Sequence, residues 1–158
     1  MSKISTCLWF NGDVEEAANT YVALIPNSRV ISVSRYGPNM PLPEGTPLMV
    51  ELELDGVRFL LLNGGPQFPQ SEAASIVVQC DDQAEIDQLW DALTANGGAE
   101  SQCGWLKDRW GVSWQITPRD MGKWMSDPDK EKVARVAAAF MPMKKLDIGA
   151  IEAAYRGD

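Results

Sequence analysis

The chain has 158 residues, 45% of them hydrophobic, which suits one domain that buries roughly 70% of the surface its unfolded chain exposes. Its formal net charge of −8 argues against a nucleic-acid partner, because phosphate contacts require clustered Lys and Arg. The absence of histidine removes the side chain that most often binds metals and transfers protons at neutral pH. No apolar run approaches the ~20 residues of a membrane helix, so we expect a cytoplasmic protein with no membrane partner.

The first predicted module covers residues 4–65. A short strand begins at Thr6, and Asp13 then precedes a helix. Three strand-like segments follow within residues 28–63, bounded by Gly, Pro and Asn. The order is therefore β-α-β-β-β. The core face of the predicted helix consists of apolar residues at helical spacing: Val14, Ala17, Ala18 and Tyr21.

The second predicted module, residues 73–118, repeats this pattern. "TCLWFNGDVEEAANTYVAL" from Thr6 aligns without a gap on "SIVVQCDDQAEIDQLWDAL" from Ser75, which places Asp13 on Asp82. Each aspartate is followed three residues later by a glutamate, the spacing of a capping box. The match predicts a duplication with strand, cap and helix in one register. The second helix has a similar core face: Ile86, Leu89, Trp90 and Leu93.

Two segments lie outside the repeat. "NGGPQFPQSEAA", residues 63–74, is the predicted linker between the modules within a single domain of residues 1–158. Residues 119–158 form a predicted helical extension. One helix is expected to begin near Asp127 or Asp129, and a last one at Asp147.

The stretch "CGWLKDRWGVSWQITP", Cys103 to Pro118, predicts a β-hairpin. The segment from Asp108 to Gly111 is typical of its turn, with the aspartate capping and the glycine at positive φ, so we do not expect Asp108 or Arg109 to be catalytic. Alternation along the last strand places three polar residues on one face: Ser113, Gln115 and Thr117.

The repeat, the "NGGPQF" segment and this hairpin resemble the vicinal oxygen chelate superfamily of glyoxalases, bleomycin-resistance proteins and dioxygenases. The closer resemblance, from about Ile4 to Phe140, is to its PhnB-like branch, which carries the label 3-demethylubiquinone-9 3-methyltransferase. It implies an α+β fold in which two tandem βαβββ modules form a glyoxalase-like cup, with C-terminal helices added. It also implies a homodimer, with the helices around Val133, Val136 and Phe140 able to pack against a partner subunit.

In this superfamily His, Gln or Glu side chains at four strand positions usually bind a divalent metal. The predicted register places these positions at Thr6, at Phe59 or Leu61, at Ser75 and at Gln115. One neutral amide does not hold a catalytic metal ion, so the sequence predicts no metal and no cofactor. Two carboxylates share a face of the strand "PLMVELELDG", and alternation favours a polar stripe there rather than a metal site: Glu51 and Glu53.

Nine residues are predicted to contact the ligand: Thr6, Phe10, Asn63, Phe68, Ser75, Gln79, Cys103, Trp105 and Gln115. Gln115 is either a ligand contact or half of a cross-strand hydrogen bond, and Trp105 is either a stacking wall or core. Cys103 has no histidine or adjacent cation to activate it, so it is expected to be a packing or pocket-wall residue. Glu72 is the candidate base of the linker motif, against a surface glutamate as the alternative.

Two classes of function follow. The first is a metal-independent protein that binds a small apolar or aromatic molecule in a cup between the modules. The second is a PhnB-like enzyme of glyoxalase-like, dioxygenase-like or methyltransferase activity, with Glu72 and Gln115 as weak catalytic candidates. The pairs Gly64-Gly65 and Gly97-Gly98 do not open a helix after a strand, which argues against a nucleotide-type methyl-donor site. A cup filled by side chains, serving assembly alone, is the third alternative.

Overall fold

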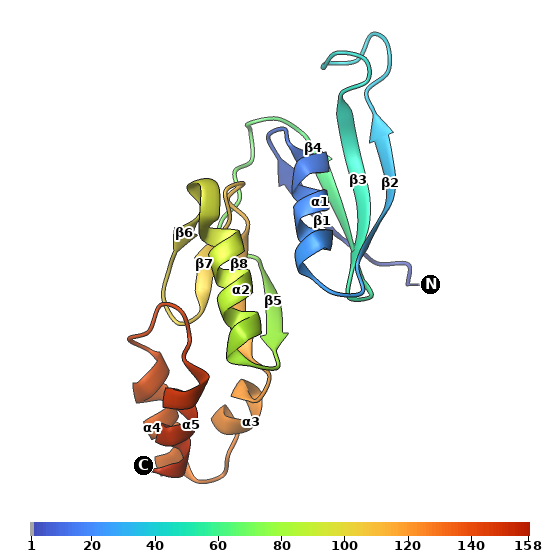
Figure 1. Ribbon diagram of the computed structural model, residues 1–158. Coiled ribbons are helices and arrows are strands. Elements are labelled where there is room, and N and C mark those ends of the chain that lie inside the picture. The colour runs from blue at the N-terminus through green and yellow to red at the C-terminus, as the bar shows by residue number, and fades with distance from the viewer. Residues whose placement is uncertain (1) are drawn as a thin grey trace. The chain divides into compact units, whose positions relative to one another are not determined.

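The computed structural model describes residues 2–158 (Figure 1). The chain divides into two compact units, the first ending at Gln70 and the second beginning at Ser71. We refer to them as unit 1 and unit 2. The boundary falls inside the segment expected to link the two modules.

Unit 1 is a four-stranded sheet with one helix. The sheet has the order β1-β4-β3-β2, in which β1 runs parallel to β4 and the other neighbours are antiparallel. The elements in chain order are β1 (Thr6–Phe10), α1 (Val14–Leu24), β2 (Arg29–Arg35), β3 (Pro47–Leu54) and β4 (Val57–Asn63).

Unit 2 repeats this topology with shorter strands. Its sheet has the order β5-β8-β7-β6, and again only the first and last strands of the module are parallel neighbours. The predicted βαβββ repeat and the α+β class are thus confirmed. The elements are β5 (Ser75–Cys80), α2 (Gln83–Thr94), the 3-10 turn η1 (Ala95–Gly97), β6 (Ala99–Glu100), β7 (Trp105–Lys107) and β8 (Ser113–Pro118).

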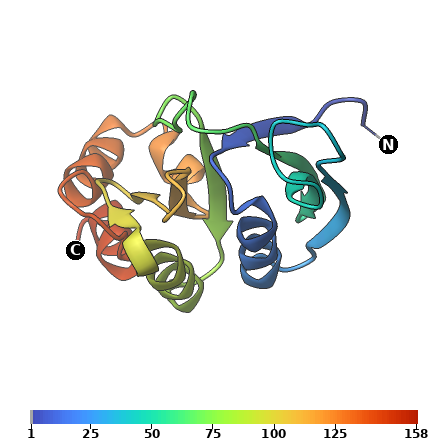
Figure 2. The same ribbon diagram turned by 90° about the horizontal axis from the view of Figure 1, so that it is seen from above.

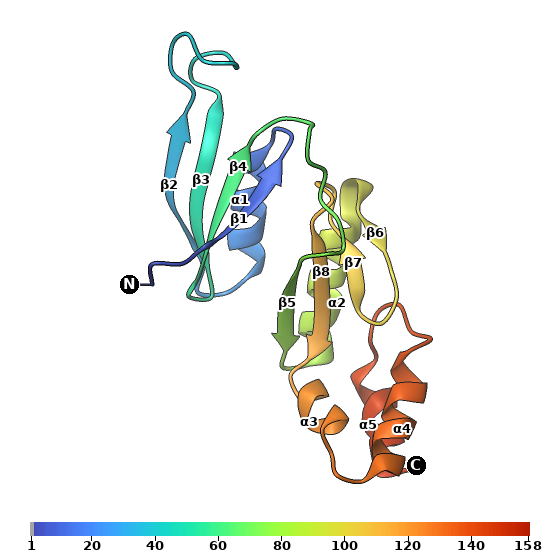
Figure 3. The ribbon, with the colours of Figure 1, turned by 180° about the vertical axis from the view of Figure 1, so that it is seen from behind.

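Each helix covers one face of its own sheet and leaves the other face open (Figures 2 and 3). In unit 1 the covered face includes Phe10 and Leu52, and Tyr21 of α1 is buried as well. In unit 2 Trp114 and Ile116 of β8 are fully buried on the side of α2. Burying such side chains contributes roughly 1.5–3 kcal/mol each, so these two faces are the main cores of the fold.

The strands of the two units differ in register by one residue relative to their helices. Two residues separate Phe10, the last residue of β1, from Asp13, whereas a single residue separates Cys80, the last residue of β5, from Asp82. The prediction of one shared register was therefore wrong for the strands. Because successive strand residues point to opposite faces, Phe10 lies in the core of unit 1, not on the open face where it was expected.

The two capping sites differ as well. Asp82 accepts a hydrogen bond from the backbone N–H of Glu85 at 2.9 Å, and the Glu85 carboxylate accepts from the N–H of Asp81 at 2.7 Å. This is close to the predicted capping box. Asp13 instead has a φ of 55° and makes no side-chain capping hydrogen bond, so the predicted cap of α1 was wrong.

Three helices follow the repeat: α3 (Met121–Met125), α4 (Lys130–Phe140) and α5 (Ile148–Arg156). Asp129 and Asp147 cap α4 and α5, as the sequence predicted. Val136 is fully buried within the chain, in a cluster with Trp124 and Ile151. The sequence suggested that Val136 could pack against a partner subunit, but its burial prevents such a contact. None of the helices within residues 2–158 is long and apolar enough to cross a bilayer.

The "NGGPQF" segment folds around Trp9 of unit 1. The Trp9 indole N–H donates to the carbonyl of Gly65 at 2.8 Å, and the Phe68 ring packs edge-on at 4.9 Å between centroids. Gln70 donates from its side chain to the Trp9 carbonyl. The glycine at position 64 leaves the room that the indole ring fills. This segment therefore completes unit 1 and is not a free linker.

We expect Gly64→Ala to destabilise unit 1 by about 2 kcal/mol, because the new methyl group would overlap the Trp9 ring and overpacking costs of this kind run to roughly 1–3 kcal/mol. Urea denaturation followed by far-UV circular dichroism measures the change. Gly37→Ala is the matched control, since its nearest neighbour would be the Met40 sulfur at 3.6 Å. Equal stability of both variants would contradict this prediction.

Candidate functional site

The open face of the unit 2 sheet carries two rows of side chains. Hydrogen-bonded register aligns Ser113 of β8 with Ser75 of β5 and with Lys107 of β7. In the next row Gln115 lies between Val77 and Trp105. Neighbours in a row share a face, so these six side chains form one continuous surface. The sequence predicted this face for Ser75, Val77, Ser113 and Gln115.

A cavity of about 220 Å³ lies at the β7 side of this face. Trp105 and Lys107 contribute from β7, Ser113 from β8 and Glu72 from the segment before β5. Residues 99–101 line it at the edge strand β6. An aromatic wall beside a few polar groups is the usual composition of a small-molecule site, although the volume is below that of most drug-sized pockets.

Lys107 and Glu72 form an ion pair at this cavity, with 2.6 Å between Nζ and Oε1. The hydrogen bond from Lys107 holds the pKa of the Glu72 carboxyl below its usual range, and a backbone hydrogen bond adds to this effect. The Glu72 side chain is 63% exposed. A general base at neutral pH needs a raised pKa, so the geometry does not favour Glu72 in that role. The pairing joins residues 35 apart in sequence and was not predicted.

Ser113 is the polar residue at the floor of the cavity. It is 1% exposed, and its Oγ has no hydrogen-bond partner among residues 2–158. Almost all buried polar side chains in proteins are hydrogen-bonded. Alternation along the strand predicted the correct face for Ser113, but it cannot predict how deeply this side chain is buried.

Gln115 makes the cross-strand hydrogen bond that the sequence left as one of two alternatives. Its Nε2 donates to Ser75 Oγ at 2.9 Å. The two predicted contact residues therefore hold each other on the open face. The sequence also left two roles for Trp105, a stacking wall or a core residue. Trp105 is half-buried and lines the cavity instead of filling the core.

The hairpin turn at Asp108 is structural, as predicted. Asp108 is 3% exposed, and its Oδ1 accepts from the N–H groups of Trp110 and Val112, each at 3.0 Å. Its Oδ2 accepts from the Trp114 indole at 2.9 Å. Gly111 has a φ of 85°, the conformation expected for the turn. Asp108 thereby fixes the strand that carries Ser113.

The Cys103-Gly104 turn holds the C-terminal segment and does not line the cavity. The N–H groups of Cys103 and Gly104 donate to the carbonyls of Met143 and Lys144 at 2.7 and 2.8 Å. The Cys103 sulfur lies 3.1 Å from the carbonyl oxygen of Met141. These contacts favour the packing role for Cys103 over the pocket-wall role; the sequence left both open.

The remaining predicted contact residues do not converge on the unit 2 cavity. Thr6 is exposed on β1 and Gln79 is exposed near the end of β5, while Phe68 is 63% exposed beside Trp9. Asn63 is buried, where its Oδ1 accepts from the Gly12 N–H and its Nδ2 donates to the Pro47 carbonyl, both at 3.0 Å.

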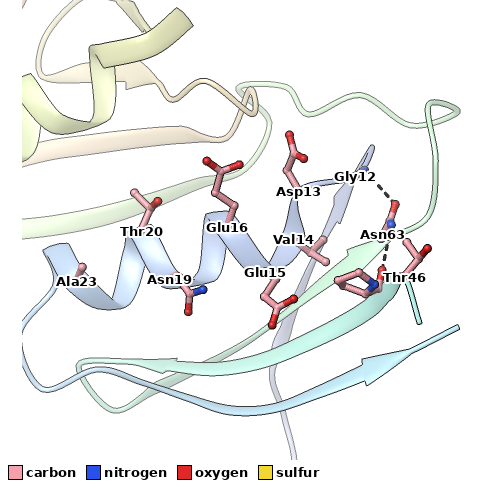
Figure 4. A pocket seen from close by; sticks show the side chains of 11 residues that line it. Gly12, Asp13, Val14, Glu15, Glu16, Asn19, Thr20, Ala23, Thr46 and Asn63 are labelled. Atoms are coloured by element: carbon pink, nitrogen blue, oxygen red, sulfur yellow. Dashed lines mark hydrogen bonds between the residues drawn. The ribbon is translucent and has the colours of Figure 1, made fainter. Parts of the chain in front are cut away.

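Asn63 also lines a separate groove of about 880 Å³ along α1, shown in Figure 4. The groove contains the carboxylates of Asp13, Glu15 and Glu16, at the beginning of the helix. Acidic side chains there interact favourably with the helix dipole, and Glu15 also pairs with Arg35 at 3.0 Å. These interactions explain the acidic residues without a ligand.

Comparison with known proteins identifies the family. The model of the 3-demethylubiquinone-9 3-methyltransferase family matches residues 2–117. The chain belongs to this family. A PhnB protein from Bacillus cereus is 36% identical with a TM-score of 0.68, over 74% of this chain and 99% of that chain. Among proteins with curated descriptions, none matches the chain.

More distant structures share the fold of this PhnB-like chain. Protein PA1353 from Pseudomonas aeruginosa is 22% identical with a TM-score of 0.61, over 75% of this chain and 98% of that chain. The fosfomycin resistance protein FosX from Listeria monocytogenes is 13% identical with a TM-score of 0.56, over 80% of this chain and 98% of that chain. The glyoxalase-like fold of two βαβββ modules is thus confirmed.

The residues at the superfamily's metal positions do not fit a divalent ion. Phe59 and Leu61 are apolar and lie in the core of unit 1. Thr6 is neutral, and Ser75 and Gln115 hydrogen-bond to each other. A firmly held divalent metal needs several carboxylate, imidazole or thiolate ligands, and these positions supply none. Within residues 2–158, no three His, Cys, Asp or Glu side chains gather as a metal site would require.

The two carboxylates of β3 are engaged in pairs across the sheet. Glu51 pairs with Arg58, and Glu53 lies 3.4 Å from Arg29. They occupy the open face of unit 1, as the polar-stripe interpretation predicted. The opposite face of β3 is buried: Val50, Leu52 and Leu54.

We expect Cys80 to resist alkylation in the native protein. Burial, together with the nearby carboxylates of Glu85, Asp81 and Asp82, raises the pKa of its thiol to about 12, which leaves roughly one thiolate in ten thousand at pH 8. Iodoacetamide followed by peptide mass spectrometry should label the exposed Cys7 and leave Cys80 unlabelled until guanidinium is added. Rapid native labelling of Cys80 would contradict this.

Proposed function

We propose that this protein binds a small, partly aromatic molecule on the open face of the unit 2 sheet, without a metal ion. The observation that carries the proposal is the cavity walled by half-buried Trp105, with Lys107 and buried Ser113 beside it. An aromatic face provides apolar contact, and the polar groups provide orientation. The neutral and apolar side chains at the superfamily's metal positions support binding without a metal.

Binding is better supported than catalysis. The lowered pKa of Glu72 makes it a weak base, and Gln115 is held by Ser75 and does not titrate. Methyl transfer, which the family label suggests, has less support still. Gly64 packs against Trp9, and Gly98 follows the end of α2, so neither begins a helix that could receive a nucleotide-type cofactor.

Native mass spectrometry of the protein as purified tests the proposal, with 2-naphthol added to a second sample as a neutral aromatic probe. We expect an organic adduct or bound naphthol, no stoichiometric metal, and a dimer, the state we propose from the family resemblance. Trp105→Ala should lose the bound molecule, whereas Trp110→Ala, in the hairpin turn, should retain it. A stoichiometric divalent metal, or protein that carries no adduct and binds no naphthol, would overturn the proposal.

A further inference from the structure

We infer that the ligand carries a carboxylate, which Lys107 binds as an ion pair and to which the Ser113 hydroxyl donates a hydrogen bond. This inference rests on the proposed function and names the class of molecule: a small aromatic acid with one negative charge. It follows from three properties of the cavity.

The first property is the unsatisfied hydroxyl. Ser113 is 1% exposed and lines the cavity, yet its Oγ has no partner within the described chain, residues 2–158. Burial without a hydrogen bond is unfavourable for a hydroxyl group. A group that enters the cavity with an acceptor oxygen would satisfy it. Ser113 is therefore a candidate donor to the ligand.

The second property is a cation adjacent to this hydroxyl. Lys107 and Ser113 are direct cross-strand partners on the open face. The Lys107 ammonium is held by Glu72, whose side chain is exposed and lies outside the strands. The Glu72 carboxylate therefore shows that the Lys107 ammonium binds and donates to a carboxylate at this position. A ligand carboxylate that replaces it would receive charge-assisted bonds from the ammonium and from the hydroxyl.

The third property is the charge balance, which favours an acid over a base. Glu100, the second carboxylate of the cavity lining, already accepts from the Trp90 indole at 2.9 Å and lies 3.8 Å from Lys144. Glu72 is satisfied by Lys107. A ligand cation would have to displace the Lys107 ammonium, which a strand holds in place, whereas a ligand anion has only to displace the exposed side chain of Glu72. One lysine matches one negative charge, so a monoanion fits better than a phosphate dianion.

The cavity also limits the size of the molecule. Its volume of about 220 Å³ admits one or two fused rings, and Trp105 supplies a face on which they can stack. Ligand pockets for larger molecules begin at roughly 300 Å³. A bulky quinone with a long chain would extend beyond this cavity.

Titration of the full chain with 2-naphthoate and with its neutral analogue 2-naphthamide tests the inference. The readout is the NMR signal of the Trp105 indole N–H, assigned with Trp105→Phe. We expect naphthoate to shift this signal and to bind about tenfold more tightly than the amide. Lys107→Gln should remove that preference, and Ser113→Ala should weaken naphthoate binding several-fold. Glu72→Gln should tighten it, because Lys107 loses its internal competitor.

Lys123→Gln is the matched charge control, since Lys123 lies on α3 and does not line the cavity. The affinity for naphthoate should depend less on salt concentration in Lys107→Gln than in the unaltered protein, and the control should show no such change. Equal affinity for acid and amide would overturn the inference while leaving the proposed function intact. Naphthoate binding that is unchanged in Ser113→Ala would also overturn it. Failure of the proposed function itself is seen separately, as the absence of any adduct or naphthol binding.

Discussion

Replacing Asp108 with alanine is expected to destabilise unit 2 by about 3 kcal/mol or more. The Asp108 carboxylate accepts hydrogen bonds from two backbone N–H groups and from the Trp114 indole. Asp108 itself is only 3% exposed. Alanine would remove the carboxylate that accepts from the Val112 N–H and from the buried indole, and loss of the acceptor of a buried donor costs roughly 1–3 kcal/mol. The loss should also disturb the strand that carries Ser113.

Urea denaturation followed by tryptophan fluorescence measures this change, because five of the six tryptophans belong to unit 2. Asp120→Ala is the control. Asp120 is exposed and its side chain does not cap α3, so we expect a change within about 0.5 kcal/mol. A loss below about 1 kcal/mol for Asp108→Ala would show that the turn holds its shape without the carboxylate.

Gly104→Ala is expected to cost about 3 kcal/mol and to loosen the C-terminal helices. Gly104 has a φ of 83°, where a side chain costs roughly 1–2 kcal/mol. A methyl group there would also lie 2.8 Å from the carbonyl oxygen of Ile116 and 3.0 Å from Leu146. The carbonyl belongs to the sheet and cannot move aside, so the clash adds to the strain.

Urea denaturation followed by tryptophan fluorescence measures the loss of stability. Proteolysis of the native protein measures how readily the C-terminal helices detach. Gly122→Ala is the matched control, because a methyl group on Gly122 would have no other atom within 4 Å and the φ of this residue is ordinary. Gly104→Ala should be cleaved after Pro118 faster than the control. Equal cleavage and equal stability would mean that the turn can relax, contrary to the geometry described above.

Local chemistry made much of the fold predictable. The core faces of α1 and α2 follow from apolar spacing, and the caps at Asp82, Asp129 and Asp147 follow from one side chain and the N–H groups that come directly after it. The Asp108 turn is equally local. Such features depend on a few adjacent residues, so a single sequence is enough to recognise them.

The candidate site was less predictable because it depends on contacts that are distant in sequence. The pairing of Glu72 with Lys107 and the alignment of Lys107 with Ser113 both arise from strand pairing. Alternation placed Ser113 on the correct face, but no local pattern indicates that its hydroxyl lacks a partner. The loop before α1 is one residue longer than the loop before α2. Because successive strand residues point to opposite faces, this difference alone made the predicted face of Phe10 wrong.

That additional residue also means that the two halves are not interchangeable parts. A chimera that introduced the longer loop of unit 1 before α2 would turn Ile76 and Val78 outward and move Ser75 beneath the helix. Such a change would move several side chains to the opposite face of the sheet at once. Point substitutions would have to change the residues of that face one at a time. After a duplication, a single insertion or deletion at this loop can thus exchange the polar face of an edge strand for an apolar one.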